Sequence, residues 1–458
     1  MFTLKEIVDI TAGEPIYFKP GLKIEGISTD SRKIKGGELF IAIKGDNFDG
    51  ADFVDDARKK GAAAALVSKV IKAEPDFPLI KVKDATKALG GIAGLHRERF
   101  NIPVIAITGS NGKTTTKDMV AHILGAKFKV LKTGGTENNQ IGVPLTVFKL
   151  KDQDFAVLEM GTNSPGEIEY NCSILKPTIA VITNIGPSHL EKLKDISSVA
   201  KEKLSLIKSL PKAGTWVRNA DDNMLAGRWF KDIKIIDYGI NKTEVDFNAR
   251  NIKQAKNGIE FTLTAPDSSM GHTIYLPIFG VHNVYNALAA IATCLNFVDI
   301  KIIKEALSGF KGLHMRMEVL NGDGFTIIND SYNSNPSSFK CAVSTLKSYP
   351  SPGKRIMVAA DMLELGDNSK ALHYESGKSI TEEGIDLLIT FGELASGIAR
   401  GAIDSGMDKR KVSVFSDKND IVRYLRNIVN NGDVVLIKGS RRMKMEEIVD
   451  CFTTCSTH

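Results

Sequence analysis

A short apolar run followed by a glycine-rich turn constrains the fold of this 458-residue chain more than any other feature of its sequence. Residues 102–108, Ile-Pro-Val-Ile-Ala-Ile-Thr, have the length and composition of a buried strand. The turn 109–112 follows, and residues 113–124 then place apolar side chains such as Met119 and Ile123 at helical spacing. Strand, glycine turn and helix are together typical of the first unit of a parallel α/β sheet.

The turn has the composition of a phosphate-binding loop. Its two glycines let the backbone curl so that N–H groups point at one anion, and the following helix adds its positive end. Lys113 can reach the β- and γ-phosphates, and the Thr114 hydroxyl can bind Mg²⁺. Gly109 and Gly112 enclose only Ser110-Asn111, so the loop is a shortened variant; accidental glycines before a helix are the alternative. We expect ATP to be bound by Gly109, Ser110, Asn111, Gly112, Lys113, Thr114 and Thr115.

The composition fits a globular protein with several cores. Hydrophobic residues make up 43% and charged residues 25% of the chain, which excludes dominant disorder and a fibrous repeat. At about 150 residues per domain, the length predicts about three domains. The net charge of +6 suits an anionic substrate. The basic runs 409–411 and 441–444 are too short for the basic stripe of a nucleic-acid-binding protein, so no nucleic-acid partner is expected.

Cysteine usage and the first residues indicate a cytoplasmic protein. Residues 1–9 carry acidic side chains where a signal peptide would have an apolar core. The longest mostly apolar stretch, 285–298, is too short for a membrane span, and we take a monomer as the default state. No second Cys/His pair completes a zinc site, so reduced thiols are expected. The five cysteines are Cys172, Cys294, Cys341, Cys451 and Cys455.

Further apolar runs of strand length divide the chain into three parts. A second α/β unit lies in the last third, and boundaries fall near 96–101 and 312–317. We therefore expect an α/β protein with a small N-terminal domain (1–99), a central nucleotide-binding domain built on a parallel sheet (100–313) and a C-terminal Rossmann-like α/β domain (314–458). The expected buried strands are 155–158, 179–183, 355–359, 387–390 and 434–437.

Polar side chains next to these runs are candidate Mg²⁺ ligands. Glu159 follows the run 155–158 and is expected at the sheet edge that also carries the glycine loop, although a surface carboxylate is the alternative. His189 follows the run 179–183 after a short turn, but a lone histidine is more often structural. Lys201 and Lys203 lie in a helical segment, where two positions correspond to about 200° of rotation. Only one of them can face the site, and a solvated helix face is the alternative for both.

Several short motifs occur in order along essentially the whole chain. They are STDSR (28–32), TGSNGKTTT (108–116), TENNQIGVP (136–144), EMG (159–161), HLE (189–191), GVHNVYNA (280–287) and DSYNSNP (330–336). In combination they resemble the motifs of the Mur ligases of peptidoglycan synthesis. DMLELG (361–366) and KGSR (438–441) are similar to the branch that adds D-alanyl-D-alanine to UDP-N-acetylmuramoyl-tripeptide, and the DNPR-type motif of the diaminopimelate- or lysine-adding branch is not found. The family usually has Gly-Arg at the hinge before the last domain, where this chain has Met315-Arg316.

The resemblance implies roles in ATP and metal binding for residues at the matching positions. Lys113 and Thr114 bind phosphate and Mg²⁺, and Glu159 and His189 become ligands of a second Mg²⁺. The family's carbamylated lysine falls at Lys203 rather than Lys201; a carbamate anion can bind Mg²⁺ where an ammonium would repel it. The remaining ATP contacts are Asn283 and Asn286 on the adenine side, with Arg316 and Asp330 reaching ribose and phosphate.

The resemblance also implies the reaction and the substrate contacts. ATP phosphorylates the terminal carboxylate of UDP-N-acetylmuramoyl-tripeptide, and the amine of D-alanyl-D-alanine attacks the resulting acyl phosphate. The nucleotide sugar is expected at Thr29, Ser31 and Arg32. Asn138 and Asn139 are expected to meet the substrate at the central domain, with loop capping by asparagine as the alternative. Candidates for the peptide and dipeptide ends are Asp361, Lys438, Ser440 and Arg441.

Two other classes of function are weighed against this one. A sibling ligase would use the same chemistry with another amino acid, either in forming the Mur tripeptide or in folylpolyglutamate synthesis. A P-loop ATPase or switch would couple hydrolysis to a macromolecular partner, and it predicts a basic stripe with interleaved aromatic residues. ADP release measured with each candidate amine would separate the sibling ligases. ATPase activity that DNA or RNA stimulates, and that is indifferent to UDP-N-acetylmuramoyl-peptides, would favour the ATPase.

Overall fold

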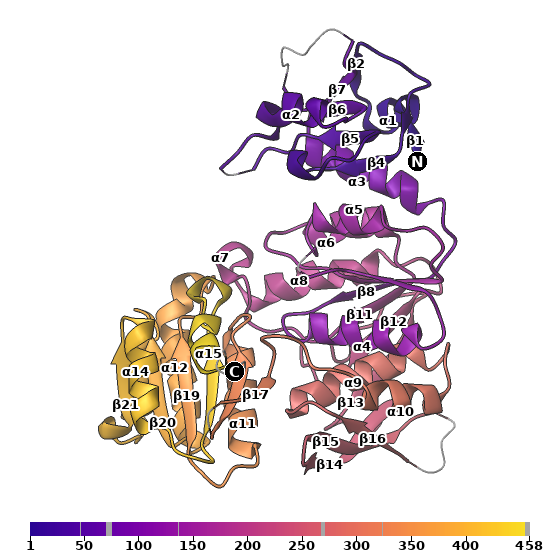
Figure 1. Ribbon diagram of the computed structural model, residues 1–458. Helices are drawn as coiled ribbons and strands as arrows, with labels where there is room; N and C mark the ends of the chain where they lie inside the picture. Colours follow the sequence, from indigo (N-terminus) through magenta and orange to yellow (C-terminus); the bar gives the residue numbers. More distant parts are fainter. Residues whose placement is uncertain (46, 70–75, 136, 267–270, 323, 454–458) are drawn as a thin grey trace. The chain divides into compact units, whose positions relative to one another are not determined.

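The computed structural model describes residues 1–45, 47–69, 76–135, 137–266, 271–322 and 324–453. The chain forms two compact units. Its helices and strands are labelled in Figure 1. Among the described residues, no helix combines the length and apolar content that crossing a bilayer requires. The first unit comprises Met1–Ala106, Lys129–Gly161 and Gly166–Thr178, and the second Ile107–Phe128, Thr162–Pro165 and Ile179–His458.

The N-terminal residues form a five-stranded sheet in the order β2-β7-β6-β5-β4. All neighbours are parallel except β2, which runs antiparallel to β7. Every residue of β6 is buried. Its sequence is apolar throughout, as expected of a strand that is covered on both faces. The elements are β1 (Phe2–Thr3), α1 (Leu4–Thr11), β2 (Glu14–Ile16), β3 (Lys23–Ile24), β4 (Gly26–Ser28), η1 (Ser31–Lys33), β5 (Glu38–Ile41), η2 (Gly50–Phe53), α2 (Val54–Lys59), β6 (Ala64–Val67), β7 (Leu79–Lys81) and α3 (Ala85–Arg97).

The middle of the chain contributes a nine-stranded sheet in the order β16-β15-β14-β13-β12-β11-β8-β10-β9. β9 pairs with β10 in parallel, as do successive strands from β11 to β14, whereas β14, β15 and β16 are antiparallel. The expected strand and helix on either side of the glycine turn are confirmed as β8 (Val104–Thr108) and α4 (Lys113–Gly125). The other elements are β9 (Val130–Lys132), α5 (Gly142–Val147), β10 (Phe155–Glu159), α6 (Glu167–Leu175), β11 (Ile179–Ile182), α7 (Leu190–Leu193), α8 (Ile196–Lys208), β12 (Thr215–Asn219), β13 (Lys234–Gly239), β14 (Phe247–Ala255), β15 (Gly258–Thr264), β16 (His272–Leu276), α9 (Val281–Cys294) and α10 (Ile300–Ser308).

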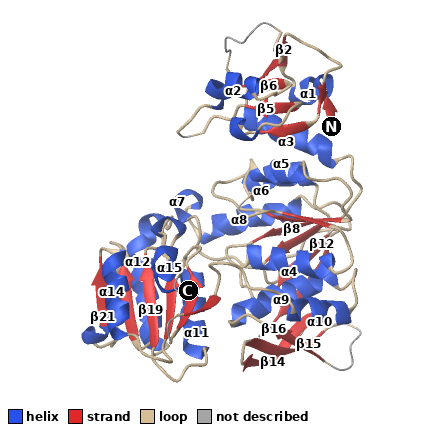
Figure 2. Cartoon of the chain, in the orientation of Figure 1, coloured by secondary structure: helices blue, strands red, loops and turns tan. Residues whose placement is uncertain are grey.

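The last third of the chain forms a six-stranded sheet in the order β17-β18-β22-β19-β20-β21, parallel except for the pair β17 and β18 (Figure 2). Its elements are β17 (Glu318–Asn321), β18 (Thr326–Asp330), α11 (Pro336–Ser348), β19 (Arg355–Ala360), η3 (Gly366–Asn368), α12 (Ser369–Glu382), β20 (Leu387–Phe391), α13 (Ser396–Asp404), η4 (Lys409–Lys411), β21 (Val412–Phe415), α14 (Lys418–Ile428), β22 (Val434–Lys438), η5 (Arg441–Met443) and α15 (Glu446–Thr453). The three strands expected here from apolar runs are confirmed as β19, β20 and β22.

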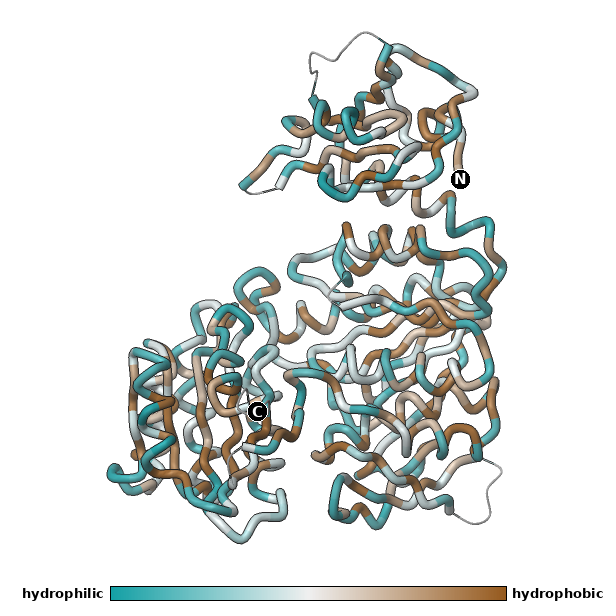
Figure 3. The backbone as a smooth tube through the Cα atoms, in the orientation of Figure 1, coloured by the Kyte–Doolittle hydropathy of each residue, from teal (hydrophilic) through white to brown (hydrophobic). Residues whose placement is uncertain are grey.

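Helices cover both faces of this six-stranded sheet. Alternate residues of a strand point to opposite faces. Met357 and Leu436 therefore join a core with α11, α12 and α13, while Val358 and Ile437 join a core with α14 and α15. Hydrophobic residues follow the strands in Figure 3, as a sheet buried on both faces requires. The C-terminal third is thus a doubly wound α/β layer structure, as the sequence predicts.

Candidate active site

The loop between β8 and α4 has the curled backbone expected of a phosphate cradle. Gly109 and Gly112 have φ angles of +150° and +79°, which residues other than glycine rarely adopt. A Cβ atom would collide with the Thr183 hydroxyl at Gly109 and with the Asn286 amide oxygen at Gly112. Glycine is therefore required at both positions, and accidental glycines are the wrong interpretation.

Hydrogen bonds to the segment after β11 hold this loop in place. The backbone N–H groups of Ser110 and Asn111 donate to the main-chain and side-chain oxygens of Asn184 at 3.0 and 2.9 Å. The Ser110 hydroxyl donates to the carbonyl of Gly186 at 2.8 Å and accepts from its N–H at 2.9 Å. The Thr183 hydroxyl donates to the carbonyl of Asn111 at 2.5 Å. The protein's own hydrogen bonds thus stabilise the curled conformation of the loop.

Two cations lie against the loop. The Lys113 ammonium donates to the carbonyls of Gly109 and Ser110 at 2.9 and 3.3 Å, so its charge lies over the cradle. The Arg316 guanidinium donates to the Thr114 hydroxyl at 3.0 Å and lies 3.9 Å from the centroid of the Tyr332 ring. Lys113, Thr114 and Arg316, predicted separately for ATP binding, are therefore brought together. Tyr332 was not predicted, although it lies in the DSYNSNP motif.

Asn283 and Asn286 lie one turn apart on α9 and are both buried. Asn286 donates to the side-chain oxygen of Asn283 at 3.0 Å and accepts from the Thr116 hydroxyl on α4 at 3.3 Å. Asn283 donates to the carbonyl of Phe279 at 2.7 Å. This chain of amides fixes α9 against the helix that follows the phosphate cradle and places both residues beside the cradle. Their role on the adenine side stays a prediction.

Glu159 ends β10 with its side chain buried and only one of its two carboxylate oxygens hydrogen-bonded. Oε1 accepts from the Asn138 side chain at 2.8 Å, whereas Oε2 is buried without a hydrogen-bond partner among the described residues. A buried acceptor left unpaired is costly, so the oxygen fits a bound cation. Asn139 instead caps the backbone, because its side-chain oxygen accepts from Ile141 and Gly142 at 3.1 and 2.8 Å. The described residues contain no cluster of three His, Cys, Asp or Glu side chains that could hold a metal.

His189 lies at the start of α7 and pairs with a carboxylate that sequence reasoning missed. Its Nδ1 atom is 2.9 Å from Oε2 of Glu364, and this hydrogen bond is the main cause that lowers the pKa of the Glu364 carboxyl. Glu364 belongs to the DMLELG motif, which distinguishes one branch of the resemblance and gives this residue no predicted role of its own. Its position in the motif was the signal, but nothing in the spacing connects it to a histidine 175 residues away.

Lys203 on α8 is 1% exposed, whereas Lys201 is exposed to solvent. This confirms that only one of the two lysines faces the interior. Burial, and to a smaller extent the positive charge of Lys113, lowers the pKa of Lys203 well below its ordinary value. Among the described residues, Lys203 makes no hydrogen bond or ion pair. The neutral amine is the form that reacts with CO₂, and a lowered pKa favours that form, so the environment fits the predicted carbamate.

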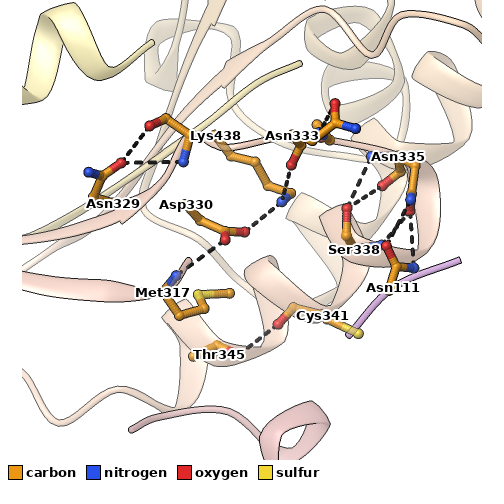
Figure 4. Close-up of polar contacts among 12 residues, drawn as sticks. Asn111, Met317, Asn329, Asp330, Asn333, Asn335, Ser338, Cys341, Thr345 and Lys438 are labelled. Atoms are coloured by element: carbon orange, nitrogen blue, oxygen red, sulfur yellow. Dashed lines mark hydrogen bonds and ion pairs between the residues drawn. The ribbon is translucent and has the colours of Figure 1, made fainter. Parts of the chain in front are cut away.

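Asp330 and Lys438, predicted for different ligands, form one buried ion pair (Figure 4). The Lys438 ammonium lies 2.5 Å from Oδ2 of Asp330 and donates to the carbonyl of Asn333 at 3.1 Å. The other carboxylate oxygen of Asp330 accepts from the N–H of Met317 at 3.2 Å. The pair thus joins the carboxyl ends of β18 and β22 to the segment that carries Arg316.

Four of the remaining predicted substrate residues have partners within the protein: Arg32, Asp361, Ser440 and Arg441. Buried Ser440 accepts from the N–H of Leu363 at 2.8 Å, and Asp361 accepts from the N–H of Ala395 at 2.7 Å. These bonds fix loops at the carboxyl edge of the C-terminal sheet. Arg32 donates a hydrogen bond to Asp30 at 2.9 Å, and Arg441 donates one to Glu446 at 2.5 Å. Thr29 and Ser31 are the neighbours of Asp30 in the chain. Their substrate roles stay predictions.

One further contact to the phosphate cradle was not expected from the sequence. The side-chain amides of Asn111 and Asn335 donate to each other's oxygens at 3.3 and 2.8 Å (Figure 4). Asn335 also caps α11, accepting from the N–H of Ser338 at 2.9 Å. The cradle is therefore tied to the first turn of a helix from the C-terminal sheet.

Comparisons with known proteins match this arrangement along the chain. The Mur ligase middle domain model matches residues 107–294, which contain the phosphate cradle, Glu159, His189 and Lys203. The model of the Mur ligase glutamate ligase domain matches residues 315–441, and that of the Mur ligase family catalytic domain matches residues 23–97. This chain belongs to the Mur ligase family. Mur ligases are ATP-dependent enzymes that form amide bonds and use Mg²⁺, so the expected reaction class, ATP and Mg²⁺ are confirmed.

Individual relatives of this Mur ligase match over almost the full length. UDP-N-acetylmuramoyl-tripeptide–D-alanyl-D-alanine ligase of Bacillus subtilis is 38% identical over 97% of the chain and 96% of the relative. A crystal structure of MurF from Acinetobacter baumannii superposes with a TM-score of 0.91 at 30% identity, covering 99% of both chains. MurF from Thermotoga maritima, solved in complex with ADP, matches with a TM-score of 0.85 at 27% identity, covering 94% of this chain and 97% of that one. The predicted α/β fold with three Mur ligase domains is confirmed.

Proposed function

We propose that this Mur ligase joins D-alanyl-D-alanine to UDP-N-acetylmuramoyl-tripeptide in peptidoglycan precursor synthesis. The observation that carries the proposal is the full-length similarity to ligases of that name, at 38% identity over 450 residues. The similarity includes the C-terminal residues, which we assign to the incoming dipeptide. ATP and a nucleotide-linked precursor as substrates place the reaction in the cytoplasm, and we propose that the enzyme acts as a monomer.

We further propose a division of labour among three domains. Residues 1–99 bind the UDP sugar, residues 100–313 bind ATP, and residues 314–458 bind the dipeptide. In this scheme the nucleotide sugar contacts Thr29, Ser31 and Arg32, and the acceptor carboxylate approaches Asn138 and Asn139. Asp361, Lys438, Ser440 and Arg441 line or support the dipeptide site. A guanidinium such as Arg441 can hold the dipeptide carboxylate through two hydrogen bonds.

The energetic problem in the first step is repulsion between two anions, the substrate carboxylate and the triphosphate. Lys113 places positive charge at the cradle, and Arg316 supplies a second cation at Thr114. Such preorganised donors lower a barrier by about 3–4 kcal/mol each. The structure supports this role because both cations already lie against the cradle.

The proposed reaction then follows in two steps. A carboxylate oxygen of the tripeptide attacks the γ-phosphorus of ATP, the bond to the β-phosphate oxygen breaks, and ADP departs. The amine of D-alanyl-D-alanine attacks the carbonyl carbon of the acyl phosphate, inorganic phosphate leaves, and the nitrogen loses a proton as the amide forms. The cradle, Lys113 and Arg316 hold the phosphoryl group through the first step, and closure over the substrates excludes water that would hydrolyse the acyl phosphate.

The residues that would hold Mg²⁺ are Thr114 beside the phosphates and Glu159, His189 and a carbamylated Lys203 at a second position. When bound, Mg²⁺ neutralises charge on the phosphate oxygens. The unpaired Oε2 of Glu159 and the burial of Lys203, which lowers the pKa of its amine, support this assignment. The carbamate forms when the neutral Lys203 amine bonds to the carbon of CO₂ and releases one proton. Intact-protein mass spectrometry after trapping of the carbamate, with Lys203→Arg as the reference, tests the modification.

A phosphate-release assay with UDP-N-acetylmuramoyl-tripeptide, ATP, Mg²⁺ and D-alanyl-D-alanine tests the proposed function. We expect release that requires all four components, together with an amide product of the combined mass. Reactions containing D-glutamate, L-lysine or diaminopimelate in place of the dipeptide serve as controls and should give no product. Preferred use of one of these amines would contradict the proposal and favour a sibling ligase, whereas ATP hydrolysis indifferent to the peptide substrates would favour a P-loop ATPase.

A further inference from the structure

The contact between His189 and Glu364 involves main chain as well as side chains. Besides the Nδ1 to Oε2 hydrogen bond of 2.9 Å, the N–H of Glu191 donates to the carbonyl of Glu364 at 3.3 Å. Gly366 lies against the same segment, because a Cβ atom there would be in van der Waals contact with the Cα atom of Glu191 at 3.4 Å. Residues 189–191 and 364–366 therefore meet at three independent points, one through side chains and two through the backbone.

Both residues of the pair have backbone conformations that are unusual for residues other than glycine. His189 has a φ angle of +53° and Glu364 one of +65°, in the left-handed region. Such conformations persist where the surrounding structure determines them, and they concentrate at functional sites. Here each left-handed turn aims its side chain at the other, so the backbone of both loops favours the contact.

The chemistry of the pair determines which nitrogen of His189 carries the proton. A carboxylate can only accept hydrogen bonds, so Nδ1 is the protonated nitrogen and donates to Glu364. In a neutral imidazole the lone pair then lies on Nε2, and among the described residues no group hydrogen-bonds to that atom. A histidine that ligates a metal through one nitrogen commonly donates its other N–H to a carboxylate, which fixes the ring and the tautomer.

We propose that Glu364 is a positioning residue that holds His189 in the Nδ1–H tautomer, so that Nε2 is the atom available to Mg²⁺. The inference rests on the proposed function, because it takes His189 as a metal ligand. Glu364 lies between β19 and η3 in the C-terminal sheet, whereas His189 belongs to the loop after β11. The metal site is therefore complete only while these two loops are in contact, which links the state of the C-terminal residues to metal binding.

Binding of Mn²⁺ to the enzyme in the presence of a non-hydrolysable ATP analogue tests the inference without turnover. Electron paramagnetic resonance of free Mn²⁺ gives the affinity, and His189→Ala identifies the part of the binding that depends on the imidazole. Loss of such a carboxylate typically weakens metal binding about 10- to 100-fold. We expect a weakening in that range for Glu364→Ala and a smaller one for Glu364→Gln, whose side-chain oxygen still accepts from Nδ1.

Glu375→Ala is the matched control, because Glu375 is an exposed carboxylate on α12 that pairs with Lys378 at 2.7 Å. It should bind Mn²⁺ like the wild type. If His189→Ala weakens Mn²⁺ binding and Glu364→Ala does not, the inference fails while the proposed function stands. If His189→Ala also leaves Mn²⁺ binding unchanged, the metal role of His189 fails and the inference with it.

Nitrogen-15 spectra of the histidine rings separate positioning from simple bracing of two loops. The resonances of His189, assigned by their absence in His189→Ala, should show a protonated Nδ1 in the wild type and in Glu364→Gln. In Glu364→Ala the population should shift toward the Nε2–H form. A brace would lower the thermal midpoint of Glu364→Ala and leave the tautomer unchanged, and that result would overturn the inference.

Discussion

The guanidinium of Arg316 donates a hydrogen bond to the hydroxyl of Thr114 at 3.0 Å, although the two residues lie 202 positions apart in the chain. Arg316 leads into the C-terminal sheet, and Thr114 is in the first turn of the helix after the phosphate cradle. The guanidinium is held from its other side by the ring of Tyr332, 3.9 Å away. These two contacts thus place the cation at the cradle.

Replacing Arg316 should therefore impair catalysis more than folding. We expect Arg316→Ala to lower kcat about 10²- to 10³-fold, the loss that follows removal of one well-placed charged donor. Arg316→Lys should recover part of the rate, because it keeps the charge but loses the planar fork. Steady-state phosphate release gives both values, and a rate within twofold of the wild type for Arg316→Ala would contradict the assignment.

Tyr332 should matter through its ring and not through its hydroxyl. A cation–π contact of this kind contributes about 0.5–2 kcal/mol depending on its exposure to solvent. Tyr332→Phe should then keep kcat near the wild-type value, while Tyr332→Ala should lower it by about 2- to 30-fold. Equal losses in the two variants would show that the hydroxyl, and not the stacking on Arg316, supports the reaction.

Lys113→Ala should abolish turnover. The Lys113 ammonium lies over the carbonyls of Gly109 and Ser110, and no other lysine of α4 follows a cradle glycine directly. Removing it takes away one of the two cations that lie against the cradle and neutralise the transferred phosphoryl group. Amide formation and calorimetric titration of ATP with Mg²⁺ measure the effect. The control is Lys127→Ala, because Lys127 is exposed and follows the end of α4. Near-normal product formation by Lys113→Ala would refute the phosphate assignment.

The sequence was sufficient to predict local structure and candidate functional residues wherever both lie in one short segment. The run 102–108, the glycines of the cradle and Lys113 occupy consecutive positions, so spacing alone predicts strand, turn and helix together. The apolar runs later confirmed as β10, β19 and β22 were found for the same reason, since a buried parallel strand is apolar throughout. The exposure of Lys201 and burial of Lys203 also follow from helix geometry, once the inner face of α8 is known.

Contacts between distant segments could not be obtained in this way. The pairs His189 with Glu364 and Asp330 with Lys438 each join residues more than a hundred positions apart. No local pattern encodes such pairs, because they depend on which strand edges and loops the fold brings together. For the same reason, the sequence assigned Asp330 to ATP and Lys438 to the peptide, although the two side chains neutralise each other.

Met315 occupies the hinge position at which the family usually has glycine, and substitutions there measure the backbone strain that this difference causes. Its φ angle is +59°, a left-handed conformation that costs a residue with a side chain about 1–2 kcal/mol. We expect Met315→Gly to be more stable than Met315→Ala by about 1 kcal/mol, because both variants lose the thioether and only glycine relieves the strain. Urea unfolding of the two variants gives the difference, and an alanine variant as stable as the glycine variant would contradict the strained backbone.

Lys203 should make the unmodified protein less stable than a matched apolar variant at neutral pH. Its folded pKa lies well below the ordinary 10.5, so between those values the unfolded chain binds more protons and stability rises with pH. In CO₂-free buffer, Lys203→Met should be more stable than the wild type at pH 7 by about 1–3 kcal/mol. This advantage should shrink as the pH approaches 10.5. Urea unfolding at pH 7 and near pH 10 measures this difference in stability, and Lys201→Met, at an exposed lysine, is the control. A Lys203→Met variant that is less stable than the wild type at pH 7 would disprove the burial of an unpaired amine.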